Sequence, residues 1–294
     1  MKLSHVLVAL DMTDHDRILL QAARYLAERL DTSRTYFAHV LPQLDFSPEV
    51  TRAIEKLNNG KNSITQQIQN RIQTEVEVAF LTATVDTGTI LVNAGKPYDQ
   101  ISEWASTYDA DLIIVGHKVQ SEVYSMIATR LARNLKASVW FVPKTEKVAV
   151  NNILVPIDFS ENAMRALQTA IQWKRRDDRV KITPCHVYSK SLSYYMYGEY
   201  YSWALDEDIH KYYQQYQGFL DRFAIDDSEL QDLILVENER FNTAYSIRQR
   251  ARLGKFDLIM VGATGHSSLH SLVIGSVTEE LLEKEKEIAV LLVR

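Results

Sequence analysis

The segment from Gly262 to Ser276 has a glycine spacing suited to binding an anion. It fits Gly-x-x-Gly, then nine residues, then Gly-Ser, with the glycines at Gly262, Gly265 and Gly275. Glycines let backbone N–H groups approach phosphate oxygens without a Cβ in the way. Gly275 and Ser276 precede a helical pattern, whose first amides and dipole would favour negative charge, and the Ser276 hydroxyl adds a donor. The spacing therefore favours a phosphate site over glycines that only close turns after a strand.

Other residue types point less clearly to chemistry. Asp11 and Asp158 each stand alone after a strand, so a carboxylate pair for general acid–base catalysis is weakly supported. His266 and His270 lie four residues apart without an HExxH pattern, which does not favour a metal site. Ser267 lacks the G-x-S-x-G setting of a hydrolase nucleophile. We therefore expect no catalytic residues and no metal ligands.

Three further features have both a structural and a functional interpretation. His39 and His186 lie within apolar strands, where a histidine is more commonly a satisfied core residue than a ligand. Cys185 precedes His186, and we expect a buried, inert thiol. Nine of the fifteen tyrosines fall within residues 188–216, which favours a contact between domains or subunits, although they could instead cap their own sheet. That segment has two cations, too few for stacking on single-stranded nucleic acid.

The chain contains an internal repeat that divides it into two halves. The strand-like run Leu7–Asp11 recurs 147 residues later as Leu154–Asp158, and the run Asp111–Gly116 recurs as Asp257–Gly262. A nearly constant offset over a hundred residues indicates tandem homologous domains. We place the domains at residues 1–146 and 147–294, with a polar junction between two apolar strands.

Each half alternates short apolar runs, rich in branched residues, with amphipathic helical patterns. Such runs are typical of parallel strands covered on both faces, and the alternation predicts two doubly wound α/β sandwich domains, each with a mostly parallel five-stranded sheet. Ser160 is a candidate helix N-cap. The predicted strands are 5–10, 35–41, 88–93, 111–116 and 138–142, then 152–157, 181–187, 232–237, 257–262 and 288–293.

Composition and charge narrow the class of protein. Hydrophobic residues make up 46% and charged residues 24% of the chain, the balance of an ordinary globular protein. The net charge of −5 does not favour general binding to nucleic acid, whose phosphates are negative. The single cysteine excludes an intramolecular disulfide framework. No apolar run approaches the length of a membrane span. We expect a cytoplasmic protein without nucleic-acid or membrane partners.

With its repeat and its glycine loop, the sequence resembles the universal stress protein family in its tandem two-domain form. The resemblance covers both halves, and the loop matches the nucleotide-binding signature of the family. It implies ATP as the ligand, with Mg²⁺ as an optional companion ion. Carried over by position, it implies phosphate contacts from the glycine loop, a basic side chain at His266, base and ribose contacts near Asp158, and backbone groups of Val187 for the adenine. The complete predicted site is Pro156, Asp158, Val187, Gly262, Gly265, His266, Gly275, Ser276 and Val277.

The first half departs from that pattern. Val119 takes the place of the second glycine, and Ser125 and Met126 align with Gly275 and Ser276. Part of the base pocket remains, as Asp11 and Val40, while the phosphate loop does not. We therefore expect one ATP per chain, held by the second half.

The resemblance implies an ATP-binding stress-response regulator, which we expect to act through conformation or partner contact. The alternatives are a slow ATPase or adenylyl-type enzyme, and a structural adaptor that binds no nucleotide. Each half ends in an apolar strand, and the exposed edge of such a strand can pair with another strand. We expect residues 138–142 and 288–293 to pair within one chain, giving an internal pseudo-dimer, with homodimerisation through the tyrosine-rich segment as a further arrangement.

Overall fold

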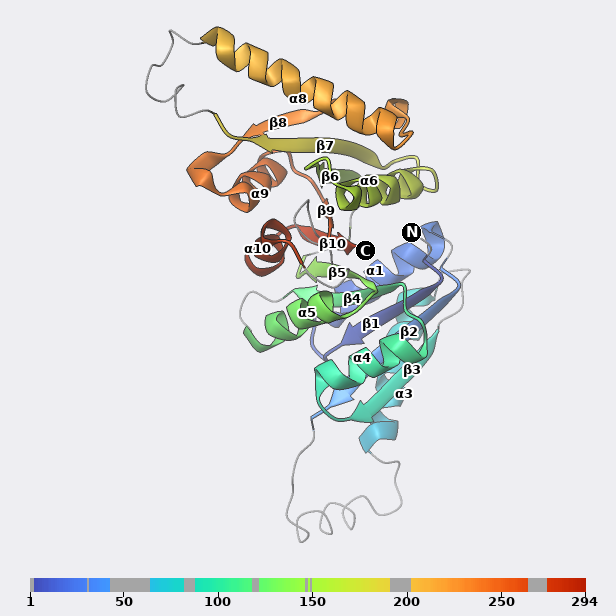
Figure 1. Ribbon diagram of the computed structural model, residues 1–294. Coiled ribbons are helices and arrows are strands. Elements are labelled where there is room, and N and C mark those ends of the chain that lie inside the picture. Colours follow the sequence, from blue (N-terminus) through green and yellow to red (C-terminus); the bar gives the residue numbers. More distant parts are fainter. Residues whose placement is uncertain are drawn as a thin grey trace. The chain divides into compact units, whose positions relative to one another are not determined.

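The computed structural model describes residues 3–30, 32–42, 64–81, 88–117, 122–145, 148, 150–190, 202–263 and 274–294 (Figure 1). It divides into two compact units, of which the first comprises residues 2–131 and 144–148 and the second residues 132–143 and 149–294. The strands are β1(His5–Leu10), β2(Arg34–Leu41), β3(Thr89–Ala94), β4(Leu112–His117), β5(Ser138–Pro143), β6(Asn152–Pro156), β7(Lys181–Tyr188), β8(Ile234–Glu237), β9(Leu258–Gly262) and β10(Ala289–Val293).

Helices alternate with these strands, as expected for parallel sheets connected by crossovers. The α-helices are α1(Asp16–Arg29), α3(Ile64–Phe80), α4(Pro97–Thr107), α5(Glu122–Asn134), α6(Glu161–Lys174), α8(Ser202–Arg222), α9(Thr243–Leu253) and α10(Ser276–Lys284), and the short 3₁₀ turns are η2(Asp227–Glu229) and η3(Glu239–Phe241).

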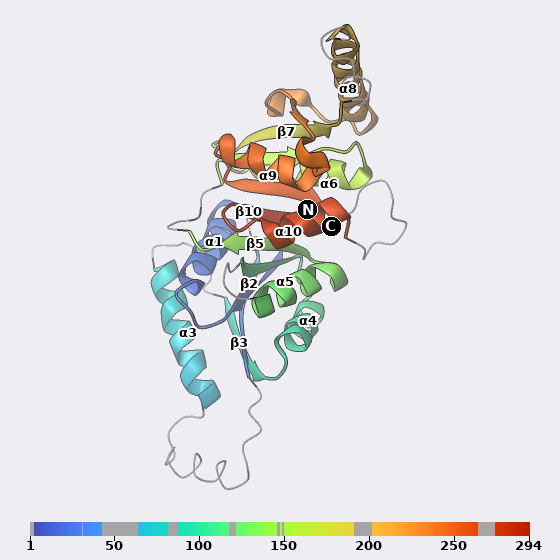
Figure 2. The same cartoon turned by 90° about the vertical axis from the view of Figure 1, so that its left-hand side faces the viewer.

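The first unit contains a parallel sheet in the order β3-β2-β1-β4. Helices α1 and α3 cover one face of this sheet and α4 covers the other (Figure 2). The strands are buried on both faces, and Val6, Leu7 and Val8 of β1 are fully inaccessible. Because β2 and β4 flank β1 on opposite sides, the strand order reverses there, and the carboxyl end of β1 faces a crevice.

The second unit contains a sheet in the order β5-β10-β9-β6-β7-β8. Its strands are parallel except for β5, which pairs antiparallel with β10, with Phe141 opposite Val290. This confirms the expected pairing of the two end strands. Trp140 of β5 packs edge-on against Trp173 of α6, with ring centroids 5.8 Å apart. Strand β6 lies between β7 and β9, so the second unit has its own reversal of strand order at the carboxyl end of β6.

The predicted fold class is confirmed, and every predicted strand lies within about two residues of an observed one. Short apolar runs become strands because both of their faces are covered, as Leu154 and Val155 in β6 and Ile259 and Met260 in β9 illustrate. The predicted N-cap of α6 is also observed, since the Ser160 hydroxyl accepts a hydrogen bond from a backbone N–H in the first turn. Each half of the chain therefore presents the carboxyl ends of its central strands as the place for a site.

Candidate functional site

A cavity of about 310 Å³ lies at the carboxyl ends of β6, β7 and β9 in the second unit. The first turns of α6, α9 and α10 also contribute to its wall. Seven of the nine predicted site residues line it, namely Pro156, Asp158, Val187, Gly262, Gly275, Ser276 and Val277. Gly265 and His266 lie outside the described residues, as do His270 and Ser267. The fold therefore brings together residues that are up to 121 positions apart, from Pro156 to Val277.

Asp158 is held in a tight turn between β6 and α6. Its Oδ1 accepts a hydrogen bond from the backbone N–H of Ser160 at 3.1 Å. Phe159, between them, adopts a left-handed conformation with φ of 64°, which is strained for an aromatic residue. Ser160 then caps α6 by accepting from Ala163 N–H at 3.2 Å. The turn thus fixes the Asp158 carboxylate at the rim of the cavity, and an acceptor there suits a ligand with hydroxyl or amino donors.

The N-terminus of α10 supplies donors to the opposite side of the cavity. Ser276, Val277 and Thr278 are the first three residues of this helix, where amides have no partner one turn earlier. The amide of Gly275, by contrast, donates to the carbonyl of Ala263 at 2.8 Å. The Thr278 hydroxyl donates to the Gly262 carbonyl at 3.0 Å, which ties the first turn of α10 to the end of β9. Amides that have no partner within their own helix are a ready site for an anion.

Gly262 and Gly275 differ in whether the described structure requires a glycine. Gly275 has φ of −70° and ψ of 150°, an extended conformation that any residue can adopt. Gly262 is needed for packing, because a Cβ there would lie 2.4 Å from the carbonyl oxygen of Asn162 in the first turn of α6. Neither Gly262 nor Gly275 has a positive φ. Gly262 brings β9 and α6 together, and this shapes the cavity floor.

Burial shifts the pKa values of two side chains of β7, His186 and Cys185, which both line the cavity. The His186 Nδ1–H donates to the carbonyl of Ile157 at 2.7 Å, while burial holds the pKa of the imidazole below its usual value of 6.5. Cys185 is fully buried, and burial raises the pKa of its thiol to about 12, so the thiol stays protonated. The expectation of a buried Cys185 is confirmed, and a group with so high a pKa is a poor nucleophile at neutral pH.

The structure adds residues to the wall that the sequence did not single out. Thr243 and Ile247 of α9 line the cavity. The side chain of Asn242 fixes this helix, since it accepts from Tyr245 N–H at 2.7 Å and donates to Glu280 of α10 at 2.8 Å. The signal that could have found Thr243 is the repeat, because Pro97 and Ile101 stand at the matching positions of the first half and line its cavity.

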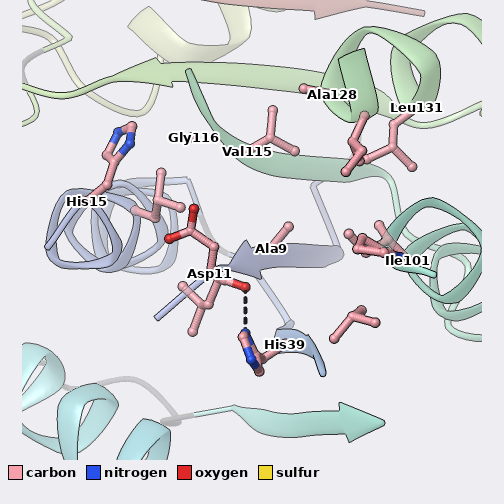
Figure 3. Close-up of a pocket in the computed structure, with 14 residues that line it drawn as sticks. Ala9, Asp11, His15, His39, Ile101, Val115, Gly116, Ala128 and Leu131 are labelled. Carbon is pink, nitrogen blue, oxygen red and sulfur yellow. Dashed lines mark hydrogen bonds between the residues drawn. The ribbon is translucent and has the colours of Figure 1, made fainter. Parts of the chain in front are cut away.

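The first unit has a smaller cavity of about 90 Å³ at the corresponding place. Figure 3 shows Asp11, His15 and His39 at one end and Ile101 and Leu131, among others, at the other. Repeat positions correspond in the two cavities, so that Asp11 matches Asp158 and His39 matches His186. His39 shares a 3.0 Å hydrogen bond with the carbonyl of Leu10, the same interaction that His186 makes in the second unit.

A buried carboxylate distinguishes the first cavity from the second. Asp16 stands where the second half has Ala163, and its carboxylate accepts from the backbone N–H groups of Asp11 at 3.1 Å and Met12 at 2.7 Å. Burial, together with the neighbouring Asp11 carboxyl, raises the pKa of Asp16 to about 7. When it is ionised, Asp16 adds negative charge next to Asp11, which lines this cavity, and such charge opposes an anionic ligand.

The tyrosine-rich segment is described in part. Tyr194, Tyr195, Tyr197, Tyr200 and Tyr201 lie outside the described residues. Of the others, Tyr216 is buried and Tyr212 contacts both His186 and Tyr188, at centroid distances of 5.0 and 5.7 Å. Tyr213 is exposed. Several of these rings thus cover the sheet of their own unit.

No three histidine, cysteine, aspartate or glutamate side chains in the described part of the chain gather as a metal site would require. Among the described helices, none is long and apolar enough to cross a membrane.

Comparison with known proteins relates both halves of the chain to one family. The model of the universal stress protein family matches residues 2–143 and 149–294. A universal stress protein from Archaeoglobus fulgidus is similar in structure, with a TM-score of 0.63, 14% sequence identity, and coverage of 99% of this chain and 96% of that one. A functionally unknown protein from Pseudomonas aeruginosa PAO1 has a TM-score of 0.60, 13% identity, and coverage of 99% and 92%. Among curated proteins, no match was found.

Proposed function

Because the chain belongs to the universal stress protein family, we propose that it is an ATP-binding stress-response regulator whose second half holds one nucleotide. The observation that carries the proposal is the convergence of Pro156, Asp158 and Val187 with the start of α10 around one cavity. These residues come from separate strands and a helix, so their common location is a property of the fold. A site of this kind suits a ligand with an anionic end and a polar, ring-containing end.

The residues present fit the phosphate part of ATP. The first amides of α10 and the Ser276 hydroxyl are donors without a competing carboxylate among the residues that line the cavity at that helix. Bound there, ATP would supply a polyanion that satisfies these donors. The cavity of about 310 Å³ is more than three times the volume of its counterpart in the first unit. This difference supports one nucleotide per chain.

The Asp158 side of the cavity fits the base and ribose. Its carboxylate is held by Ser160 N–H, and an acceptor in this position can bind ribose hydroxyls. Apolar walls from Ile157 and Ile247 suit the faces of a base. Asp158 and His186 are titratable side chains of this wall, but the His186 Nδ1–H is already donated to the Ile157 carbonyl and the Asp158 carboxylate already accepts from Ser160 N–H, so we propose a regulatory role over an enzymatic one.

Calorimetric titration of the whole protein with ATP tests the proposal. The binding free energy of a micromolar site is about 8 kcal/mol, and three or four charge-assisted hydrogen bonds to phosphate, of about 1.5–3 kcal/mol each, supply most of it. Because the first half lacks the glycine loop, we expect a stoichiometry of one ATP per chain. Gly265→Val should abolish binding, and Lys118→Ala in the first half should leave it intact. Two equivalent sites, or binding that survives Gly265→Val but not Lys118→Ala, would contradict the assignment.

Two further measurements separate the proposal from its alternatives. Mass spectrometry of small molecules released from the purified protein should detect an adenine nucleotide. A turnover assay with ATP and Mg²⁺ should show no rapid hydrolysis. Rapid turnover that is sensitive to Ser276→Ala would favour the enzyme, and the lack of any bound nucleotide would favour the structural adaptor.

A further inference from the structure

The cavity of the first unit has a buried apolar end and an acidic end that reaches solvent. Ile101, Ala128 and Leu131 form the apolar end, and none of them is more than 6% exposed. Asp11 lines the opposite end and is partly exposed (Figure 3). An amphipathic ligand can therefore bury its apolar part in this cavity and keep a polar head group at Asp11, next to water.

Two carboxyl groups lie close together at the acidic end. Asp16 is 1% exposed, and its two oxygens accept from the backbone N–H groups of Asp11 at 3.1 Å and Met12 at 2.7 Å. The Asp11 carboxylate adds to the effect of burial in raising the pKa of Asp16, as like charges held together do. Among the described residues that line the cavity, none is a lysine or an arginine. A cation at Asp11 would offset the repulsion between the two carboxylates, whereas an anion would add to it.

The Asp11 carboxylate can accept hydrogen bonds from a ligand as well as from the protein. Its Oδ1 accepts from the Thr13 hydroxyl at 2.6 Å, and an ionised carboxylate has about four acceptor positions. The other titratable side chains that line the cavity are His15, which is buried, and His39, whose Nδ1 is bonded to the Leu10 carbonyl. A primary ammonium group has three N–H donors and no acceptor, so its chemistry matches this end of the cavity.

The volume of the cavity restricts the apolar part of a ligand to a short chain. An apolar cavity of about 150 Å³ holds a benzene molecule. The cavity of the first unit is smaller, at about 90 Å³. Its size and its apolar end therefore suit a short unbranched alkyl chain better than an aromatic ring.

We propose that the cavity of the first unit binds a small primary alkylammonium ion, whose ammonium group contacts the Asp11 carboxylate and whose chain lies against the apolar end. This site is separate from the nucleotide site proposed for the second unit. The repeat shows how the two cavities diverge, since Asp16 stands where the second half has Ala163, and the second cavity, of about 310 Å³, is more than three times as large. The two halves thus keep the same place for a ligand and differ in the charge and size that this place accepts.

The test compares probes that share a chain and differ in the head group. The whole protein is titrated with n-butylammonium, n-butanol and butyrate, and binding is followed by NMR at the methyl groups of Ile101 and Leu131. Butylammonium should bind at least about tenfold more tightly than butanol, because hydrogen bonds to a charged group are stronger than neutral ones. Butyrate should bind more weakly than butanol, because its charge has the same sign as Asp11. Methylammonium should bind at least about tenfold more weakly than butylammonium, because each buried CH₂ group changes the affinity about fourfold.

Asp11→Asn keeps the shape of the side chain and removes its charge, so the preference for butylammonium over butanol should fall towards one. Asp158→Asn, the matched change in the second unit, should leave that preference as it is in the wild type. The comparison of head groups in the wild type needs no variant to fold. Equal affinity for butylammonium and butanol in the wild type, tighter binding of butyrate, a preference that survives Asp11→Asn, or no saturable binding of butylammonium would each overturn the inference.

Discussion

The first residue of α10 allows one backbone donor to be deleted without breaking the helix. Proline is accepted at the first helical position, because the amide there has no partner in the helix and φ near −65° is already suitable. The residue before a proline must be extended, and Gly275 is, with φ of −70° and ψ of 150°. The chain already places Pro97 at the start of α4. Ser276→Pro should therefore fold normally.

The magnitude follows from the bond that is lost. Ser276→Pro removes both the hydroxyl and the amide, whereas Ser276→Ala removes the hydroxyl alone, so the difference between the two variants isolates the amide. A hydrogen bond from an amide to a charged phosphate contributes about 1.5–3 kcal/mol. At about 1.4 kcal/mol per factor of ten, the proline variant should bind ATP at least about tenfold more weakly than the alanine variant. The free energy of unfolding of both variants should lie within about 1 kcal/mol of the wild-type value.

Calorimetric titration with ATP and with adenosine measures the effect and its location. Adenosine lacks the phosphates, so its affinity should be the same in Ser276→Pro and Ser276→Ala. The reasoning is refuted if the proline variant binds ATP as tightly as the alanine variant. It is equally refuted if adenosine loses affinity by the same factor, because the amide would then act on the nucleoside part.

Two other predictions concern stability. Gly262→Ala should lower the free energy of unfolding by about 1–3 kcal/mol, because its Cβ would lie 2.4 Å from a backbone oxygen. Gly218→Ala should raise the free energy of unfolding by about 0.5–1 kcal/mol, because Gly218 lies near the end of α8 with nothing within 4 Å of an added Cβ, and urea denaturation compares the two variants. Asp16 has a pKa of about 7 when folded against 3.8 for an unperturbed carboxyl, so the folded state binds its proton more tightly. Its contribution to stability is greatest below about pH 4 and declines as the pH rises towards 7. Denaturation between pH 4 and 8 should show this decline disappear in Asp16→Asn and persist in Asp14→Asn, and a decline that persists in both would contradict the role of Asp16.

The sequence by itself determined the repeat, the strands and the place of the site. Strand positions are local, because a run such as Leu154 to Ile157 is apolar and branched whatever lies elsewhere in the chain. The carboxyl ends of such strands meet at one edge of a parallel sheet, so Asp158 and Val187 could be placed together before any coordinates. The end-strand pairing was also predictable, since two apolar edges need partners.

Only the tertiary structure decided which atoms meet at that edge. Thr243 enters the cavity because α9 begins beside α10, a contact between segments far apart in the chain that no local pattern encodes. Gly262 proved to be a packing residue, since its reason is the approach of α6 and not a backbone angle. Asp16 acquired its raised pKa through burial next to Asp11. Close approach and desolvation depend on the whole fold, so the role of Thr243, the packing of Gly262 and the pKa of Asp16 could not be predicted from the sequence. Periodicity depends on neighbours in sequence, so the strands could be predicted.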